Sequence, residues 1–228
     1  MPYYHKAGKI PEKRHIQFRK PDGNLYAEEL VSTEGFSSTY SLVYHCHPPT
    51  LVKSIGEPID AAPVAAVGNN MQNRSFLTFS VPAKDDFLES RTVQLFNSDL
   101  HMTTAAPRVS MTDYFYKNAD ADELIFVHRG NGTLRTMYGS IDFEYGDYIV
   151  IPRGVIYRII TKSEKTKYMV IESPSPVYTP MRYKNSYGQY LEHSPFCERD
   201  FRVPETLVTI DEKGEFLVKI KKFNKLHH

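Results

Sequence analysis

The chain has few cysteines, no long apolar run and no excess of either charge, and each of these absences argues against a class of protein. Cys46 and Cys197 are its two cysteines in 228 residues, and neither stands in a C-x-x-C pair, so a disulfide framework is not expected. Two reduced thiols in a cytoplasmic protein are the simpler interpretation. No apolar stretch approaches the ~20 residues that a membrane helix needs, and the first residues lack the apolar core of a signal peptide.

The formal net charge is +1, with acidic and basic residues mixed along the chain. A nucleic-acid-binding protein would usually show a basic excess or stripe, so no nucleic-acid partner is expected. The lysine-rich run at residues 219–222 is interpreted as a solvated strand face. Tryptophan is absent, whereas 16 tyrosines and 13 phenylalanines are present, and hydrophobic residues make up 41% of the chain. Core packing and subunit contacts are the commoner uses of such aromatic side chains.

Short segments rich in β-forming residues follow one another, with glycine, asparagine and proline between them. This pattern predicts an all-β protein, a double-sheet jelly roll with an N-terminal arm and little helix. Gly139-Ser140 has the composition of a two-residue hairpin turn. The expected strands cover residues 39–45, 75–81, 92–96, 109–116, 123–129, 133–138, 141–145, 148–151, 155–161, 167–172, 203–210 and 215–220.

Two motifs lie within residues 111–157. Glu123 is followed by Gly130, and a second segment runs from Gly146 through Pro152-Arg-Gly154 to Tyr157. This spacing resembles the two sequence motifs of cupin barrels. Pro152-Arg-Gly154 is expected to form a tight turn that needs glycine.

The ligand positions of these motifs do not carry metal ligands. A metal-binding cupin would have histidine at the position of Tyr157 and a His-x-His pair upstream of Glu123. Here the upstream positions fall on Tyr116 and Asn118 or, with a spacing one residue shorter, on Lys117 and Ala119. A single carboxylate without imidazoles makes a poor iron or zinc site, so a metal-free barrel is expected.

Glu123 admits two interpretations. It could serve as a metal ligand or as a general acid–base, or it could be a buried carboxylate that is hydrogen-bonded to Tyr116 or Tyr157. The second interpretation is favoured, because acid–base work also needs a substrate pocket.

His45-Cys46-His47 is the sole His-x-His sequence and a weak candidate for a metal site. It would need a third ligand, for which His5, His15 and His101 are available in the sequence. Packing or hydrogen bonding beside the following Pro-Pro turn is the favoured interpretation for His45 and His47.

The order of several segments resembles the homogentisate 1,2-dioxygenase family in its bacterial form. The segments are residues 24–30 with Phe36 and residues 40–45, then residues 115–123, and then residues 149–158. The resemblance covers essentially the whole chain, which corresponds to about the first half to two-thirds of the family's length.

This resemblance implies an oxidoreductase of tyrosine and phenylalanine catabolism. The family opens the ring of homogentisate with O2 to give maleylacetoacetate. Its Fe(II) is held by two histidines and a glutamate of a C-terminal domain, which begins after the point where this sequence stops. No catalytic residue or iron ligand can therefore be carried over, and the segment alone is expected to be inactive. The family's trimers, paired into hexamers, imply a homo-oligomer. The alternative is a stand-alone, metal-free cupin that binds a small molecule or a protein partner.

The sequence predicts three regions: an N-terminal arm (residues 1–38), a degenerate cupin barrel (residues 39–175), and a wrapping segment that starts the connection to a catalytic cupin (residues 176–228). Apolar side chains near the end are expected to lie exposed where a second domain would dock. They are Phe216, Val218, Ile220 and Phe223.

Overall fold

The computed structural model describes residues 17–32, 34–37, 40–49, 51–68, 71–207 and 210–228. The described residues group into two compact units. One unit draws on Met1–Lys53, Tyr138–Ile141 and Tyr178–Gly214, and the other draws on Ser54–Met137, Asp142–Val177 and Glu215–His228. His5, His15 and the rest of residues 1–16, together with residues 33 and 38 of the predicted N-terminal arm, lie outside the described residues.

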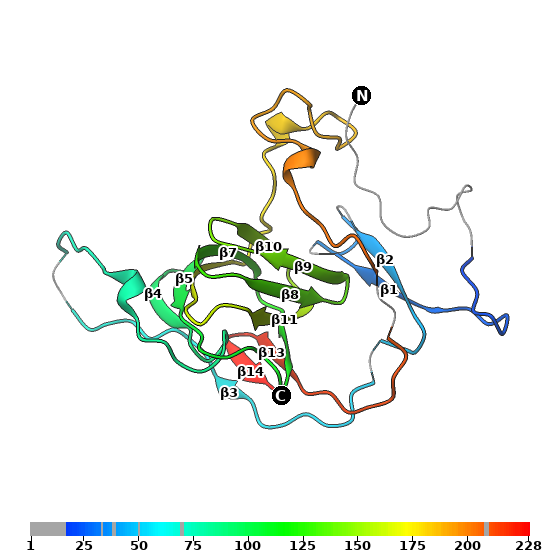
Figure 1. Cartoon of the computed structure of the whole chain (residues 1–228), viewed down its shortest axis with the longest axis horizontal. Coiled ribbons are helices and arrows are strands. Elements are labelled where there is room, and N and C mark those ends of the chain that lie inside the picture. Colours follow the sequence, from blue (N-terminus) through cyan, green and yellow to red (C-terminus); the bar gives the residue numbers. More distant parts are fainter. Residues whose placement is uncertain (1–16, 33, 38–39, 50, 69–70, 208–209) are drawn as a thin grey trace. The chain divides into compact units, whose positions relative to one another are not determined.

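The regular secondary structure of the described chain is almost entirely β, as expected (Figure 1). Three short 3-10 helices are its helical elements: η1 (Thr78–Ser80), η2 (Met181–Tyr183) and η3 (Glu198–Asp200). The strands are β1 (Ala27–Val31), β2 (Ser41–His45), β3 (Ile59–Asp60), β4 (Thr92–Phe96), β5 (His101–Ala105), β6 (Phe115–Asn118), β7 (Asp122–Arg129), β8 (Gly132–Thr136), β9 (Gly139–Phe143), β10 (Tyr148–Ile151), β11 (Ile156–Thr161), β12 (Lys167–Ser173), β13 (Val218–Lys222) and β14 (Lys225–His227).

Two sheets build the larger unit, apart from residues 139–141 of β9, which are grouped with the smaller unit. One has five strands in the order β10-β7-β12-β5-β4, and the other has seven in the order β3-β14-β13-β6-β11-β8-β9. The strand pairs are antiparallel except for β13, which runs parallel to β6. Figure 1 shows the last strands, β13 and β14 in red, next to β3 in cyan. Residues 176–228 therefore contribute two strands to the seven-stranded sheet.

The core lies between the inner faces of the two sheets. Strand β12 alternates between half-buried and buried residues along its length, the period-2 pattern of a strand with one face in a core. Its buried Tyr168 and Val170 face into the barrel, as do Tyr116 of β6 and Tyr157 of β11 from the other sheet. Tyr157 of one sheet reaches Glu123 of the other with a hydrogen bond, so the inner faces are in direct contact.

The turn before β11 fixes one wall of this interior. Val155 N donates to Pro152 O at 3.2 Å, and Gly154 has φ +91°, which together describe a β-turn that needs glycine at its third position. Gly154 N donates to Asn118 O at 2.8 Å and so ties the turn to β6. The tight turn expected at Pro152-Arg-Gly154 is confirmed.

Four local predictions were wrong. Residues 109–114 form no strand, and β6 begins at Phe115. Residues 75–81 form no strand but contain η1, where Phe79 stacks on His128 of β7 with ring centroids 3.7 Å apart. β-Propensity depends on neighbouring strands, and this segment packs by its ring instead of joining a ladder. Residues 203–207 and 210 form no strand. The turn between β8 and β9 falls on residues 137–138, so that Gly139 and Ser140 begin β9.

The smaller unit contains the antiparallel pair of β1 and β2, in which Ala27 lies opposite His45. Phe18 packs against Tyr44 of β2 with ring centroids 4.6 Å apart. Both cysteines belong to this unit, and both are free thiols.

Candidate functional site

A buried cluster of charged side chains occupies the interior of the larger unit, and Arg91 lies at its centre. Arg91 follows the turns of residues 85–90 and enters the barrel just before β4. Its Nη1 donates to Glu123 Oε1 at 2.7 Å and to Glu172 Oε1 at 3.2 Å. The Glu123 side chain is 0% exposed and that of Arg91 is 9% exposed, so this ion pair is removed from water.

Two tyrosines complete the surroundings of the guanidinium. Arg91 Nη2 donates to the Tyr157 hydroxyl at 3.1 Å, and that hydroxyl donates in turn to Glu123 Oε2 at 2.6 Å. The Tyr116 ring packs edge-on against Tyr157, and the guanidinium carbon lies 5.4 Å from its centroid. Within the described chain the buried Tyr116 hydroxyl has no hydrogen-bond partner. The predicted hydrogen bond of Glu123 to a tyrosine is thus made by Tyr157 and not by Tyr116.

Glu172 joins the cluster to the end of the barrel. Its Oε2 accepts from Asn118 Nδ2 at 3.1 Å and from Lys221 Nζ. Lys221 is the one buried residue of β13, with a side chain 10% exposed. The interpretation of residues 219–222 as a solvated face was therefore wrong for Lys221, whereas Lys222 is exposed.

The cluster is charge-balanced, with two cations, Arg91 and Lys221, facing two carboxylates, Glu123 and Glu172. Burial alone would raise the pKa of Glu172, but Arg91 and Lys221 outweigh it and hold that pKa below its ordinary value. Burial and the negative charge of Glu123 raise the pKa of Tyr157 well above its ordinary value, so this phenol stays protonated and can donate.

The four residues that the sequence predicts at cupin ligand positions lie close together. Tyr116, Glu123 and Tyr157 surround the Arg91 guanidinium, and Asn118 holds Glu172, which the same guanidinium contacts. They supply one carboxylate, two phenols and one amide, without an imidazole. Arg91, Glu172 and Lys221 were not identified from the sequence. A charged residue at a core-facing strand position was the signal available for Glu172. Lys221, on a strand whose burial does not alternate, and Arg91, in irregular chain, carry none.

The weaker candidates for metal ligands, His45 and His47, do not form a shared site. His45 Nε2 lies 2.8 Å from Glu29 Oε2, and His47 Nε2 lies 2.5 Å from Asp211 Oδ1, so each imidazole has its own carboxylate. This agrees with the hydrogen-bonding interpretation of the pair. Over the described residues, no group of three or more His, Cys, Asp and Glu side chains is arranged to hold a metal ion. No helix in the same residues has the length and apolar character needed to cross a bilayer.

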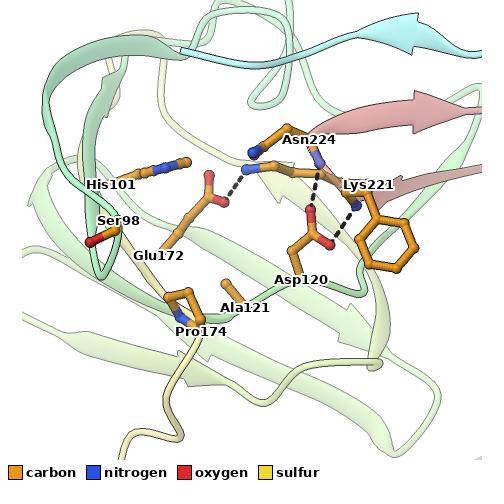
Figure 2. Close-up of a pocket in the computed structure, with 9 residues that line it drawn as sticks. Ser98, His101, Asp120, Ala121, Glu172, Pro174, Lys221 and Asn224 are labelled. Atoms are coloured by element: carbon orange, nitrogen blue, oxygen red, sulfur yellow. Dashed lines mark hydrogen bonds and ion pairs between the residues drawn. The ribbon is translucent and has the colours of Figure 1, made fainter.

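A pocket of about 330 Å³ adjoins the cluster and takes Glu172 and Lys221 as part of its wall (Figure 2). The other lining residues come from the ends of strands and the loops beside them. They are Ser98, His101, Asp120, Ala121, Pro174, Phe223 and Asn224.

The two facing sheets, the glycine turn before β11 and the inward Glu123 define a cupin barrel in which a guanidinium stands among the ligand positions. The chain belongs to the homogentisate 1,2-dioxygenase N-terminal family, whose sequence profile matches residues 61–228.

Curated relatives agree with this assignment. A protein of Saccharolobus solfataricus named "Putative dioxygenase" is 34% identical over 224 residues, covering 98% of this chain and 57% of that protein. The homogentisate 1,2-dioxygenase of Nitrobacter hamburgensis is 35% identical over 113 residues, 48% of this chain and 24% of that protein. The homogentisate 1,2-dioxygenase of Bradyrhizobium diazoefficiens is 44% identical over 50 residues, which cover 22% of this chain and 11% of that protein. The chain thus spans little more than half the length of the first relative and less of the others.

Similar solved structures are cupins. A cupin-2 domain containing protein from Shewanella frigidimarina is 24% identical, with a TM-score of 0.36, over 42% of this chain and 87% of that chain. A cupin superfamily protein from Desulfitobacterium hafniense is 16% identical, with a TM-score of 0.38, over 48% and 98%. These are likenesses of fold, from which no function follows.

Proposed function

We propose that this chain forms the non-catalytic cupin part of a ring-cleaving dioxygenase that acts on homogentisate or a close relative of it. The whole enzyme would use O2 and Fe(II) to open the aromatic ring, and its iron would be bound outside the residues of this chain. The observation that carries the proposal is the Arg91 guanidinium, which is held by two of the positions from which a metal-binding cupin would offer its ligands.

The chemistry of the donors argues against iron in this barrel. Non-haem Fe(II) sites of this type use imidazole nitrogen together with a carboxylate, and the ligand positions offer no imidazole. Glu123 already has a cation, because Arg91 contacts one of its oxygens and the Tyr157 hydroxyl contacts the other. A metal ion would have to displace a buried guanidinium and meet two protonated phenols.

In this role the barrel would serve as a scaffold on which a catalytic part docks. Phe216 and Phe223 are exposed by 63% and 80%, whereas Val218 and Ile220 on β13 are half-buried. Two of the four apolar residues expected at a docking surface are thus exposed. The proposal includes a homo-oligomer. It also includes a cytoplasmic location, and the two free thiols support the location.

Iron content and ring cleavage test the proposal. The purified chain is loaded with Fe(II) without oxygen, desalted and analysed for iron, and O2 uptake with homogentisate is then measured. We expect no stoichiometric iron and no turnover. Adding the part of the Saccharolobus relative that this chain does not cover should give an iron-containing complex. About one tightly bound iron per chain, lost on Glu123→Gln, would refute the proposal.

A stand-alone cupin that binds a small molecule without catalysis is the second candidate, favoured by the pocket of about 330 Å³ beside the cluster. Sedimentation distinguishes the two. A docking part should self-associate through its exposed phenylalanines or bind the added part of the relative, whereas a strictly monomeric chain that ignores it would favour the second candidate.

A further inference from the structure

The pocket beside the charge cluster lies where several strands end (Figure 2). His101 begins β5 and is the register partner of Glu172, near the end of β12. Lys221 lies near the end of β13, and Phe223 and Asn224 form the turn into β14. One end of the barrel therefore carries an opening with charged, polar and apolar side chains around it.

The hydrogen-bond acceptors that line this pocket are already engaged. Glu172 Oε1 accepts from Arg91, and Glu172 Oε2 accepts from Asn118 and Lys221. Asp120 Oδ1 accepts from Phe223 N at 2.7 Å and Asp120 Oδ2 from Asn224 N at 2.9 Å. These contacts neutralise part of the carboxylate charge and leave the two acidic residues with little need for a ligand cation.

The donors of the pocket are not satisfied in the same way. In the described part of the chain, neither the His101 imidazole nor the Asn224 side-chain amide makes a hydrogen bond, although His101 packs edge-on against Phe96. Lys221 has three N–H donors and makes its ion pair with Glu172. Figure 2 shows the side chains of His101 and Lys221 directed toward Glu172, from either side of it.

The rest of the lining is apolar. Ala121, Pro174 and Phe223 contribute carbon surface, and residue Phe223 is 80% exposed. A volume of about 330 Å³ suits a ligand much smaller than a nucleotide. A pocket with unsatisfied donors at its base and carbon at its side matches a compact molecule with an anionic group and an apolar body.

We propose that this pocket binds a small carboxylic acid. Its carboxylate accepts hydrogen bonds from Lys221, His101 and Asn224, and its apolar body lies against Phe223 and Pro174. A single carboxylate charge suits this setting better than a phosphate, because Glu172 and Asp120 line the same pocket and would repel a doubly charged group. The site does not depend on the role proposed for the barrel, since it involves no iron and no ring cleavage.

Isothermal titration of the whole chain with benzoate at neutral pH and low salt tests the proposal. Benzamide and benzylamine have nearly the same shape but are neutral and cationic, and inorganic phosphate tests an anion without an apolar body. We expect benzoate to bind one to one and each of the other three probes to bind at least about tenfold more weakly. Tighter binding of benzylamine or phosphate, or no binding of benzoate, would overturn the proposal.

Variants assign the binding to these residues. Lys221→Met should weaken benzoate binding at least about tenfold, whereas Lys219→Met should leave it unchanged. Lys219 is a matched control, because it lies on the same strand but pairs with Glu89 and does not line the pocket. Because Lys221→Met disturbs a buried ion pair, Asn224→Ala and His101→Phe provide an independent test at less buried positions. Unchanged benzoate binding in both of these variants, with an unchanged melting temperature, would refute the proposal.

Discussion

Replacing Arg91 by methionine should remove a large part of the free energy of unfolding of a typical domain. Methionine keeps much of the aliphatic length, so the packing of the side chain beside Phe87, whose ring centroid lies 4.5 Å from the guanidinium carbon, is largely retained. What is lost is the positive charge between two buried carboxylates.

The two carboxylates are affected unequally. Glu172 retains its contacts with Lys221 and Asn118, whereas Glu123, at 0% exposure, retains the Tyr157 hydroxyl. Most of the penalty therefore comes from leaving Glu123 charged and without a cation. Removing one partner of such a buried pair costs about 3–5 kcal/mol, against a total free energy of unfolding of about 5–15 kcal/mol for a domain.

Urea unfolding at neutral pH, followed by circular dichroism, measures this loss without adding salt that would screen the charges. Arg135→Met is the matched control, because Arg135 is exposed on β8 of the same unit and should cost less than about 0.5 kcal/mol. The double variant Arg91→Met/Glu123→Met should be more stable than Arg91→Met alone, since it leaves no unpaired carboxylate at position 123. Equal midpoints for Arg91→Met and Arg135→Met, or additive losses in the double variant, would refute this reasoning.

Three further changes test the same interior. Tyr157→Phe removes the hydroxyl that links Arg91 to Glu123 and should cost about 1–3 kcal/mol in urea unfolding, less than additively with Arg91→Met. Because the pKa of Glu172 is lowered from 4.5, its contribution to the free energy of unfolding is present above that pH and is lost as the pH falls below it. Glu172→Gln should therefore be less stable than the unchanged protein at neutral pH and should lose less stability on acidification. Parallel pH profiles of the two proteins would contradict this. Gly154→Val should lower the free energy of unfolding by about 1–3 kcal/mol of backbone strain, measured as a lower melting temperature, and Gly154→Asn should lower it by less. An added Cβ meets nothing within 4 Å, so the cost arises from φ +91° alone.

The sequence predicts the barrel well because strands and turns have local signals. The run of β-forming residues at 167–172 and the glycine of Pro152-Arg-Gly154 predicted β12 and the turn before β11. Residues 75–81 have a similar local composition but lack a neighbouring strand, and tertiary context decided against pairing. Such context cannot be read from a short window of residues.

The interior site was predictable in part for the same reason. Spacing alone identified Glu123 and Tyr157, whose hydrogen bond follows from facing positions on two strands. Arg91 enters from irregular chain 32 positions before Glu123, and Lys221 arrives from a strand 49 positions after Glu172. Neither residue lies in a segment with a periodic pattern or a motif. The three-dimensional arrangement therefore shows the cation partners of the two carboxylates, and the sequence does not.

The parallel pairing of β13 with β6 has a consequence for synthesis on the ribosome. The backbone amide of Phe223 reaches back 103 positions to Asp120, and Lys221 from the same end brings the second cation to Glu172. Until residues 218–222 leave the exit tunnel, a nascent chain therefore lacks both the neighbour of β6 and half of the positive charge in its interior. Pairing over such a separation is slow to form, and the exposed edge of β6 is meanwhile available to other chains. Ribosome-associated chaperones should accordingly engage the nascent chain after β6 has emerged and until residues 218–222 have left the tunnel.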